Sequence, residues 1–358
     1  MIGIIFIGDL KYCPYLSKYT NALESKNIKY EVLYWNREGA KSIYPQNYIS
    51  FNNKSKLNRH PFFKIKDFIY FRFWLKEKIA LKKYKKLIIL STLSGMIISD
   101  VLLKEYSNKY IFDIRDYSYE HYKLFLKKEE MLLKTSYFTC ISSKGFKDFL
   151  PRGYKYNIVH NFNKADLEYG RTFRKKPYGA TLNLTWIGAV RYFEHQKQII
   201  DKLYNDKRFK LIYHGMGPQI EVYKKYCKNK NITNVIFTGE YSNDDKHILL
   251  NDTDILNNSY KTNKIMEVKY AISNKYYDGL IFGIPQLVET GTFKNDIVKT
   301  YGVGIGISPY DKEFGDKLYD YYFNIDEKMF NSSCKNELEK ILHEDEKYIN
   351  CINKFLDC

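Results

Sequence analysis

The chain has 358 residues, of which 44% are hydrophobic, and it carries 58 Lys and Arg against 41 Asp and Glu, a net charge of +17. This length predicts two domains with a buried core each, and this hydrophobic fraction excludes an intrinsically disordered chain. Residues 1–180 hold 34 of the basic and 16 of the acidic residues, so the first half carries the whole positive excess. We therefore expect the two halves to have different binding partners.

Three sequence features exclude other classes of protein. The N-terminal run Met1 to Gly8 is apolar but short and lacks a basic flank, which favours a buried strand over a signal peptide. Polar residues interrupt the apolar stretch 87–103, which argues against a membrane span there. The six cysteines form no Cys-x-x-Cys pair, which favours reduced thiols in a cytoplasmic protein without a metal cluster.

In the first half, short apolar runs alternate with helical patterns. The expected strands are 2–7, 30–34, 87–90, 110–113, 137–141 and 157–160, and the expected helices are 14–25, 61–84, 95–106 and 119–134. Such alternation predicts a parallel sheet with helices on both faces. A polar stretch with Pro177 and Gly179 follows, which is typical of a linker.

A second alternating series begins after the linker. Its expected strands are 182–187, 210–213, 235–237, 254–256 and 286–288, and its expected helices are 195–205, 218–228, 244–251, 274–282 and 332–356. We predict an α/β protein of two doubly wound, Rossmann-like domains that face each other across a cleft, where ligands of such sheets bind. The domains are expected at 1–165 and 181–335, joined by a linker at 166–180, and a helix at 336–358 is expected to pack back on the first domain.

Loops that contain glycine follow three strands of the second half. Gly188 follows the first strand and would let the backbone approach a ligand, and Arg191 and Lys197 beyond it suit phosphate contacts. The next loop contains Gly215 and Gly217, and a third strand ends in Phe237-Thr238-Gly239. Taken one at a time, each of these loops could be an ordinary turn with basic residues at the surface.

Residues 274–285 form the most specific stretch. Asn274 is expected to cap a short helix that ends at Gly283 and Pro285. The N-terminus of this helix would offer its N–H groups to a diphosphate. Asp278, one turn into the helix, could accept two hydroxyl hydrogen bonds, as from a ribose. The alternative is a capped helix in which Asp278 only offsets the helix dipole.

The order of these loops resembles the carboxyl domain of GT-B-fold glycosyltransferases, in particular the retaining, nucleotide-sugar-dependent family four. That family has a glycine loop near Arg and Lys, a G-x-G-P loop, an F-x-G loop near the nucleobase, and a final N-K-x-[FY]-[ED]-x-L-x-x-G-x-P element. The resemblance implies a site for a nucleotide-sugar donor, with UDP as the default nucleotide. The residues that it implies for this site are Gly188, Arg191, Lys197, Gly215, Gly217, Phe237, Thr238, Gly239, Asn274, Lys275, Tyr277 and Asp278.

One position departs from the family pattern. Many members carry two glutamates eight residues apart, the first of them near the donor sugar. Here Tyr270 stands eight residues before Asp278, and Glu267 is a candidate substitute. In such enzymes most of the catalysis is charge stabilisation on the leaving diphosphate. With Arg191, Lys197 and the helix N-terminus in that role, we expect no metal and no cofactor to be required.

The first half resembles the family more loosely. Asp113-Ile-Arg115-Asp116 is similar to a family strand that ends in D-x-R-D and faces the cleft. Asp116 or His121 could orient an acceptor hydroxyl, although a single His is more often structural. Gly8 and Asp9, at the end of the first strand, could line the acceptor side.

Residues 54–86 hold twelve Lys or Arg, only two acidic residues and several aromatic rings. A helix of this composition is typical of an interfacial helix attracted to anionic lipid. The alternatives are a surface helix whose aromatic residues belong to the core, and a nucleic-acid partner, which we do not expect because no nucleic-acid motif is present. The expected membrane contacts are Phe62, Phe63, Lys64, Lys66, Arg72, Trp74, Lys82 and Lys83.

The sequence therefore predicts a cytoplasmic glycosyltransferase, peripheral at the inner face of the cell membrane. It would move a sugar from a nucleotide-sugar to a saccharide acceptor. We expect this acceptor to be lipid-linked and to belong to capsule, exopolysaccharide or lipopolysaccharide assembly. The resemblance implies that the configuration of the sugar is retained. Two alternatives remain open. One is a nucleotide-sugar epimerase of the same fold, and the other is a non-catalytic subunit that anchors a transferase to the membrane.

Overall fold

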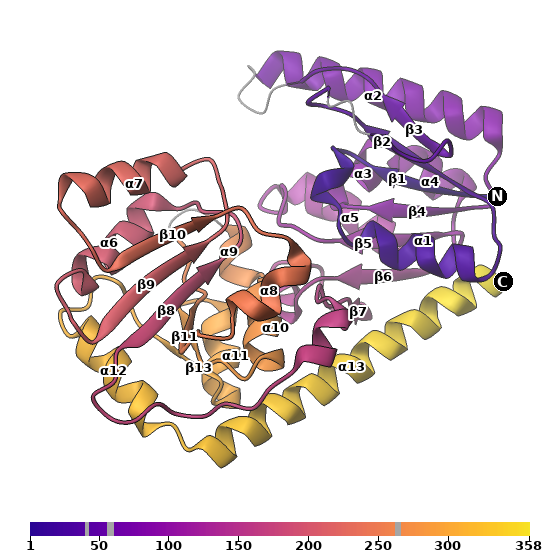
Figure 1. Ribbon diagram of the computed structural model, residues 1–358. Helices are drawn as coiled ribbons and strands as arrows, with labels where there is room; N and C mark the ends of the chain where they lie inside the picture. The colour runs from indigo at the N-terminus through magenta and orange to yellow at the C-terminus, as the bar shows by residue number, and fades with distance from the viewer. Residues whose placement is uncertain (40–42, 56–60, 262–265) are drawn as a thin grey trace. The chain divides into compact units, whose positions relative to one another are not determined.

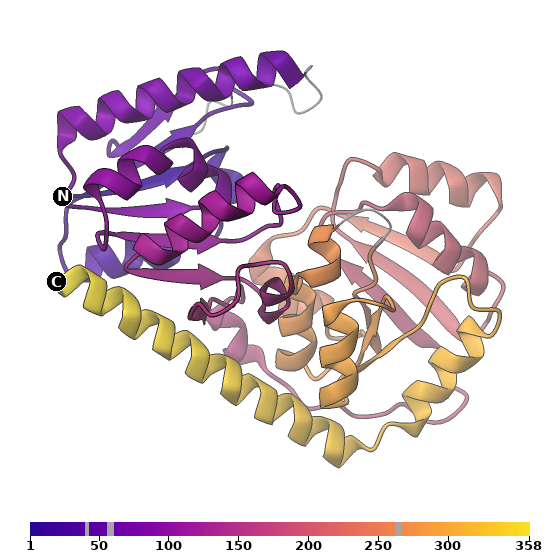
Figure 2. The ribbon, with the colours of Figure 1, turned by 180° about the vertical axis from the view of Figure 1, so that it is seen from behind.

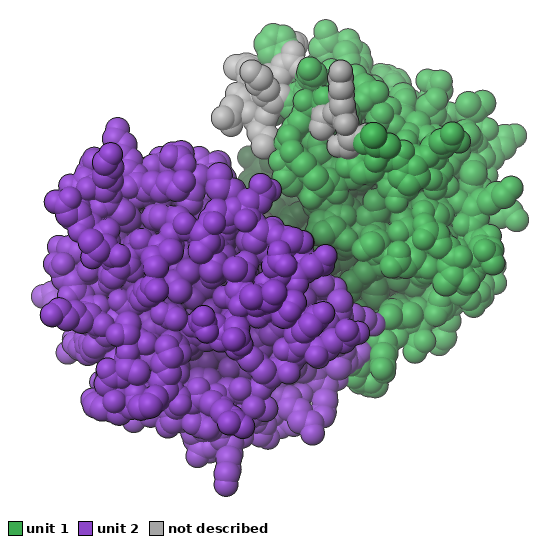
Figure 3. Space-filling view, in the orientation of Figure 1, with its two compact units in different colours: residues 1–160, 343–358 green, residues 161–342 purple. Residues whose placement is uncertain are grey.

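The computed structural model describes residues 1–39, 43–55, 61–261 and 266–358 of the chain. The described residues divide into two compact units, one of residues 1–160 with 343–358 and one of residues 161–342 (Figure 3). The division falls close to the expected start of the linker. The end of the long C-terminal helix belongs to the first unit.

The first unit is built on a seven-stranded sheet within the described residues, in which every pair of neighbouring strands is parallel. The strands are β1 (Ile2–Phe6), β2 (Tyr30–Trp35), β3 (Tyr48–Phe51), β4 (Lys86–Leu90), β5 (Tyr110–Ile114), β6 (Phe138–Ile141) and β7 (Tyr156–Ile158), in the order β3-β2-β1-β4-β5-β6-β7. The sequence predicted all of these strands except β3. That strand is at the edge of the sheet and half-buried, so it lacks a continuous apolar run.

Helices cover both faces of this sheet (Figures 1 and 2). They are α1 (Leu16–Ser25), α2 (Pro61–Lys82), α3 (Thr92–Ile97), α4 (Ser99–Glu105), α5 (Lys123–Thr135) and the short turns η1 (Leu10–Tyr12) and η2 (Lys144–Asp148). The single helix expected at 95–106 is broken in two at Ile98, which has a φ of −112° and a ψ of 24°. The helix expected from residue 119 begins at Lys123, after a loop rich in aromatic residues.

The end of α13 (Glu327–Asp357) completes the core of the first unit. Tyr348, Ile352 and Phe355 are buried in one apolar cluster with residues of β1 and α1, such as Ile4 and Tyr19. The ring of Tyr348 meets that of Tyr19 edge to face, with 6.0 Å between the ring centres. The first unit is therefore not a continuous stretch of the chain.

The second unit is built on a six-stranded parallel sheet within the described residues. The strands are β8 (Leu182–Ile187), β9 (Phe209–His214), β10 (Val235–Gly239), β11 (Ile255–Asn257), β12 (Gln286–Val288) and β13 (Gly304–Gly306), in the order β10-β9-β8-β11-β12-β13. The order reverses at β8, and ligands of open α/β sheets bind at the carboxyl ends of the strands beside such a reversal.

The helices of the second unit pack around this sheet. They are η3 (Lys164–Tyr169), α6 (Phe193–Leu203), α7 (Ile220–Asn229), η4 (Asn243–Asp245), α8 (Lys246–Leu249), α9 (Met266–Tyr270), α10 (Asn274–Ile281), α11 (Phe293–Tyr301), α12 (Phe314–Asn324) and the first part of α13. The sequence did not predict β13, α9, α11 or α12. The strand Gly304-Ile-Gly306 has a single apolar side chain, so it gives no strand signal.

Candidate functional site

The glycine loops after β8 and β9 are packed backbone against backbone. A Cβ atom on Gly215 would lie 2.3 Å from the carbonyl oxygen of Gly188, and one on Gly217 would lie 2.3 Å from that of Val190. The N–H of Gly188 donates to the carbonyl of His214, and the N–H of Gly215 donates to that of Gly239. Glycine is required in the G-x-G-P loop because any side chain would force these loops apart.

A cavity of about 310 Å³ opens at the carboxyl end of β8, where the strand order reverses. Five of the residues predicted for the donor site line it, namely Gly188, Arg191, Asn274, Lys275 and Asp278. Its other lining residues are Trp186, Ile187, Ala189, Tyr241, Asn243, Lys246, Tyr260 and Ser273. The sequence therefore brought together five residues that line one cavity, and it did not predict the other eight residues of the wall.

The loop that carries Arg191 is fixed by backbone contacts. The hydroxyl of Tyr223 donates to the carbonyl of Arg191 over 2.8 Å, and the N–H of Val190 donates to the carbonyl of Met216. The next residue, Tyr192, has a φ of 63° in the left-handed region, which turns the chain into α6. The Arg191 side chain is exposed at the cavity, so its guanidinium can meet an anion.

Helix α10 begins at the cavity, but its cap differs from the prediction. Ser273 occupies the N-cap position, and its side chain donates to the amide oxygen of Asn258 instead of capping the helix. Asn274 is the first helical residue, and its amide oxygen accepts a hydrogen bond of 2.9 Å from Asn161. The side chain of Ser273 therefore does not cap the first N–H groups of α10. Uncapped N–H groups at a helix N-terminus can bind an anion.

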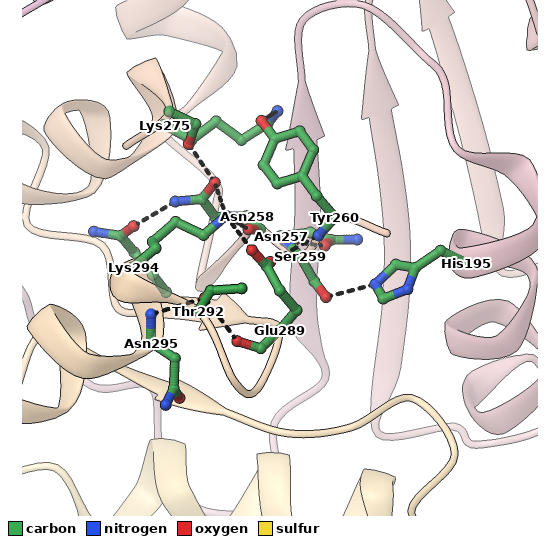
Figure 4. A network of polar contacts seen from close by, with 12 residues as sticks. His195, Asn257, Asn258, Ser259, Tyr260, Lys275, Glu289, Thr292, Lys294 and Asn295 are labelled. Atoms are coloured by element: carbon green, nitrogen blue, oxygen red, sulfur yellow. Dashed lines mark hydrogen bonds and ion pairs between the residues drawn. The ribbon is translucent and has the colours of Figure 1, made fainter. Parts of the chain in front are cut away.

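Lys275 is the most unusual cation of the cavity. Its side chain is buried, with the ammonium 3.7 Å from the ring centre of Trp186 and 4.9 Å from that of Tyr260. The ammonium also donates to the hydroxyl of Tyr260 over 2.9 Å (Figure 4). Within the described residues it forms no ion pair with a carboxylate, and burial lowers the pKa of Lys275 to about 7. The Lys275 ammonium can therefore pair with an anion that enters the cavity.

Asp278 lies in the wall of the cavity and belongs to a buried charge cluster. Its Oδ1 accepts a hydrogen bond of 2.7 Å from the ammonium of Lys246, which also pairs with Asp166 of η3. Burial raises the pKa of Asp278, while Lys246 opposes that rise. Burial also works against the Lys246 ammonium, but Asp278 and Asp166 outweigh it and hold its pKa above the usual value. The cluster contains two carboxylates and one ammonium.

The segment after β11 reaches the cavity through Tyr260 and is fixed by a buried polar network (Figure 4). Lys294 donates to the carbonyl of Asn258 over 2.6 Å and lies 3.1 Å from Glu289, which accepts the N–H of Tyr260. His195 bonds to the hydroxyl of Ser259 over 2.8 Å, and burial lowers the pKa of His195 to about 4. This network holds Tyr260 in position beside Lys275.

Several predicted donor residues lie outside the cavity wall. The ammonium of Lys197 lies 5.4 Å over the ring of Tyr226, and the ring of Phe237 stacks on Tyr213 in the core. Thr238 bonds to His214. The remaining residues of this group, Gly215, Gly217, Gly239 and Tyr277, shape the loops and the core around the site without lining the cavity.

In the first unit, the residues of the D-x-R-D motif have different surroundings, some buried and some exposed. Asp113 and Arg115 form a buried ion pair, with 2.7 Å between the carboxylate and Nε, and Tyr19 donates to the same carboxylate. This part of the D-x-R-D motif is therefore structural. Asp116 and His121 are exposed in the loop between β5 and α5.

The end of β1 supplies the two remaining residues of the expected acceptor side. Gly8 and Asp9 are buried there, and burial raises the pKa of Asp9. The carboxylate of Asp9 lies 3.5 Å from the backbone N–H of Glu38. These residues remain predictions for the acceptor side.

Among the described residues of the cavity wall, Asp278 is the only acidic one. Tyr270, the residue at the position of the missing glutamate, ends α9, and the side chain of Glu267 lies outside the described part of the chain. Among the described residues, no group of three His, Cys, Asp or Glu side chains is placed to hold a metal ion.

A larger cavity of about 410 Å³ lies at the opposite, amino-terminal edge of the sheet. Several of its polar side chains are already engaged in hydrogen bonds and ion pairs within the protein. The guanidinium of Arg171 donates to the carbonyls of Leu250, Asn251 and Phe282, and Lys176 pairs with Asp254 over 2.6 Å. Because these groups are already paired, we place the functional site in the cavity at the carboxyl end of β8.

Helix α2 has two different apolar faces. Phe71, Leu75 and Ile79 are buried against the first sheet, where Phe71 stacks on Trp35. Ile65 and Phe73 are exposed on the opposite face.

The predicted membrane residues of α2 have mixed surroundings. Phe63 and Lys66 are exposed and Lys64 is half-buried, while Trp74 is half-buried against Phe71. Arg72 pairs with an aspartate of α4, and Lys82 pairs with a glutamate of β2. Lys83 is exposed just after the helix, and the side chain of Phe62 lies outside the described residues. One face of α2 therefore belongs to the core, as the alternative interpretation expected, while membrane binding by the exposed face stays a prediction. No described helix combines the length and the apolar character needed to span a membrane.

Comparison with known proteins places the fold. No protein-family model matches the chain, and no curated protein matches its sequence. Among solved structures, sucrose-phosphate synthase from Thermosynechococcus elongatus shares 12% identity over 97% of this chain and 96% of that one, with a TM-score of 0.66. Anabaena HepE in complex with UDP-glucose shares 12% over 98% and 97%, with a TM-score of 0.63.

The lipopolysaccharide outer core galactosyltransferase WaaB shares 16% identity over 98% of this chain and 99% of that one, with a TM-score of 0.61. At these identities the likeness establishes the fold. The chain has the two Rossmann-like, parallel-sheet domains of GT-B proteins, as the sequence predicted. Membership of the retaining family four stays a prediction from the motifs.

Proposed function

We propose that this protein is a glycosyltransferase that uses a nucleotide-sugar donor, with UDP as the nucleotide. The observation that carries the proposal is the cavity at the end of β8. It combines an exposed Arg191, a buried Lys275 that pairs with no described carboxylate, the N-terminus of α10 and the carboxylate of Asp278. Two cations and a helix N-terminus suit a diphosphate, and a buried carboxylate suits the hydroxyls of a ribose.

The fold comparison supports the same assignment. Among the similar structures, HepE was solved in complex with UDP-glucose, and WaaB is a galactosyltransferase. In a transferase, Arg191, Lys275 and the backbone N–H groups would stabilise the charge that develops on the departing nucleoside diphosphate. The motifs favour retention of configuration, and Asp116 or His121 would orient the acceptor hydroxyl.

Nucleotide binding gives the direct test of this proposal. Thermal unfolding should be measured with UDP, GDP and dTDP and with their glucose conjugates. We expect one nucleotide series to raise Tm, because a ligand that binds only the folded state stabilises it. If none of the three series shifts Tm or binds in calorimetry, the proposed donor site is wrong.

The products distinguish a transferase from its two alternatives. An epimerase would convert the bound donor sugar without any acceptor, whereas a transferase releases nucleoside diphosphate and needs an acceptor or water. A non-catalytic partner subunit would do neither with purified protein. Chromatography of the donor after incubation with the protein alone separates these three outcomes.

We further propose a lipid-linked acceptor at an anionic membrane surface, in the assembly of a capsule, exopolysaccharide or lipopolysaccharide. The support is the outer face of α2, where Ile65, Ile69 and Phe73 are exposed one turn apart and Lys66 lies beside them. Exposed apolar side chains next to lysines suit the boundary between acyl chains and anionic headgroups.

The double substitution Ile69→Ser and Phe73→Ser should abolish co-sedimentation with vesicles that contain anionic lipid. Both side chains are exposed, so the fold should not change, and binding of the unchanged protein should weaken as salt rises. Met329→Ser, at an exposed apolar position of α13, is the matched control. Wild-type binding that ignores both anionic lipid and salt would contradict the membrane assignment.

A further inference from the structure

Lys246 and Asp278 line the candidate donor cavity, and Asp166 completes their charge cluster from outside the cavity wall. Of the three residues, only Asp278 belongs to a sequence motif. The three side chains come from η3, α8 and α10. Each is between 8% and 13% exposed, so all three charges are shielded from water. Such a buried cluster is stable only while its opposite charges are paired, and removal of one charged side chain leaves an uncompensated charge in the interior.

The cluster uses only one of the two carboxylate oxygens of Asp278. Within the described residues, the hydrogen bond and the ion pair of this carboxylate both go from Lys246 to Oδ1. Asp278 lines the cavity together with Lys246. The ammonium therefore fixes the orientation of the carboxylate from one side and leaves Oδ2 available to a ligand.

Neighbouring contacts keep Lys246 in place. The ring of the next residue, His247, stacks on Tyr169 of η3 with 3.9 Å between ring centres. The other charged or titratable groups that act on Asp278 are Asp166 from η3, Lys275 from its own helix and Tyr241 from the loop after β10. The ammonium of Lys275 lies beside Trp186 and Tyr260, so Lys246 is the cation in direct contact with Asp278 among the described residues.

We propose that Lys246 is a positioning residue of the nucleotide site, which keeps Asp278 ionised and oriented to receive the hydroxyls of the ribose. This inference rests on the proposed nucleotide-sugar function. Without the ammonium, two buried carboxylates would face each other, and one of them would hold a proton at neutral pH. A protonated Asp278 is a poorer acceptor for two hydroxyl hydrogen bonds than a carboxylate.

The test is the affinity for UDP, measured by calorimetry at pH 6, 7.5 and 9 for the wild type and for Lys246→Met. At pH 6 the variant should bind UDP about tenfold more weakly than the wild type or worse, because hydrogen bonds to a charged group are lost. The ratio of the Kd of the variant to that of the wild type should fall toward one at pH 9, where Asp278 ionises even without the Lys246 ammonium. With 2′,3′-dideoxyuridine diphosphate the ratio should stay near one at every pH.

Two further variants keep the test decisive. Lys246→Gln retains a hydrogen-bond donor without the charge, and it should show the same pH-dependent loss if Lys246→Met fails to fold. Lys176→Met removes a similar ion pair, to the buried Asp254, away from the cavity, and should not change UDP binding. A Kd ratio that is one at pH 6, or that does not change with pH, would overturn the positioning role. Failure of the wild type to bind any of the three nucleotides would instead overturn the proposed function.

Discussion

Replacing Arg191 with Ala, or Lys275 with Met, should lower kcat/KM for sugar transfer by about 100- to 1000-fold, the usual cost of removing one stabiliser of transition-state charge. Both cations line the cavity at the end of β8, and no described carboxylate forms an ion pair with Lys275. Met has nearly the length of Lys, and it can fill the cage between Trp186 and Tyr260 without a buried charge. The variants should therefore remain folded.

Release of nucleoside diphosphate measures the rate, and circular dichroism checks the fold. Lys225→Ala, on the exposed face of α7, is the control for a general loss of positive charge. Lys197→Ala is informative because the motif assigns Lys197 to the diphosphate, whereas the structure places its ammonium over the ring of Tyr226. We expect it to cost less activity than Arg191→Ala. Wild-type rates in both cavity variants would refute the diphosphate assignment.

Nucleotide affinity should fall as the pH rises above about 7, the value to which burial lowers the pKa of Lys275. In the empty site the ammonium is charged below this pH and neutral above it. A bound diphosphate favours the charged form and raises the pKa, so binding above pH 7 takes up a proton. The affinity should then fall by up to about tenfold per pH unit, until the pH reaches the pKa of the bound state.

Calorimetry of UDP binding in two buffers of different ionisation enthalpy counts the protons taken up. The wild type should take up nearly one proton at pH 8.5 and little at pH 6. Lys275→Arg is the matched variant, since its guanidinium stays charged at both pH values and should take up none. Equal proton uptake by the wild type and this variant would show that another group titrates.

The sequence was most informative where local pattern determines structure. Buried parallel strands are continuous apolar runs, so β8 and its neighbours were located to within a few residues. The fixed spacing of the motifs also located five residues of the cavity wall. Elements without such a pattern, β3 and β13, were missed because one is half-buried and the other holds two glycines.

The rest of the site depends on contacts between residues far apart in the chain. Lys246 follows two aspartates and looks like an ordinary surface lysine in the sequence, yet it lies between Asp166 and Asp278. Ser273 rather than Asn274 occupies the N-cap of α10, because a preference for Asn at N-caps does not fix the first residue of a helix. Lys197 lies over Tyr226 outside the cavity wall, because spacing after a glycine does not determine which face of α6 a side chain occupies.

The placement of residues 343–358 has a consequence for the order of folding during synthesis. Residues 1–160 leave the ribosome first, but their core includes Tyr348, Ile352 and Phe355 of α13. Residues 161–342 form a continuous unit and can complete their own core as soon as they emerge. Domains commonly fold in turn from the N-terminus during translation. Here the unit of residues 161–342 can mature first, while the unit of residues 1–160 waits for the end of α13.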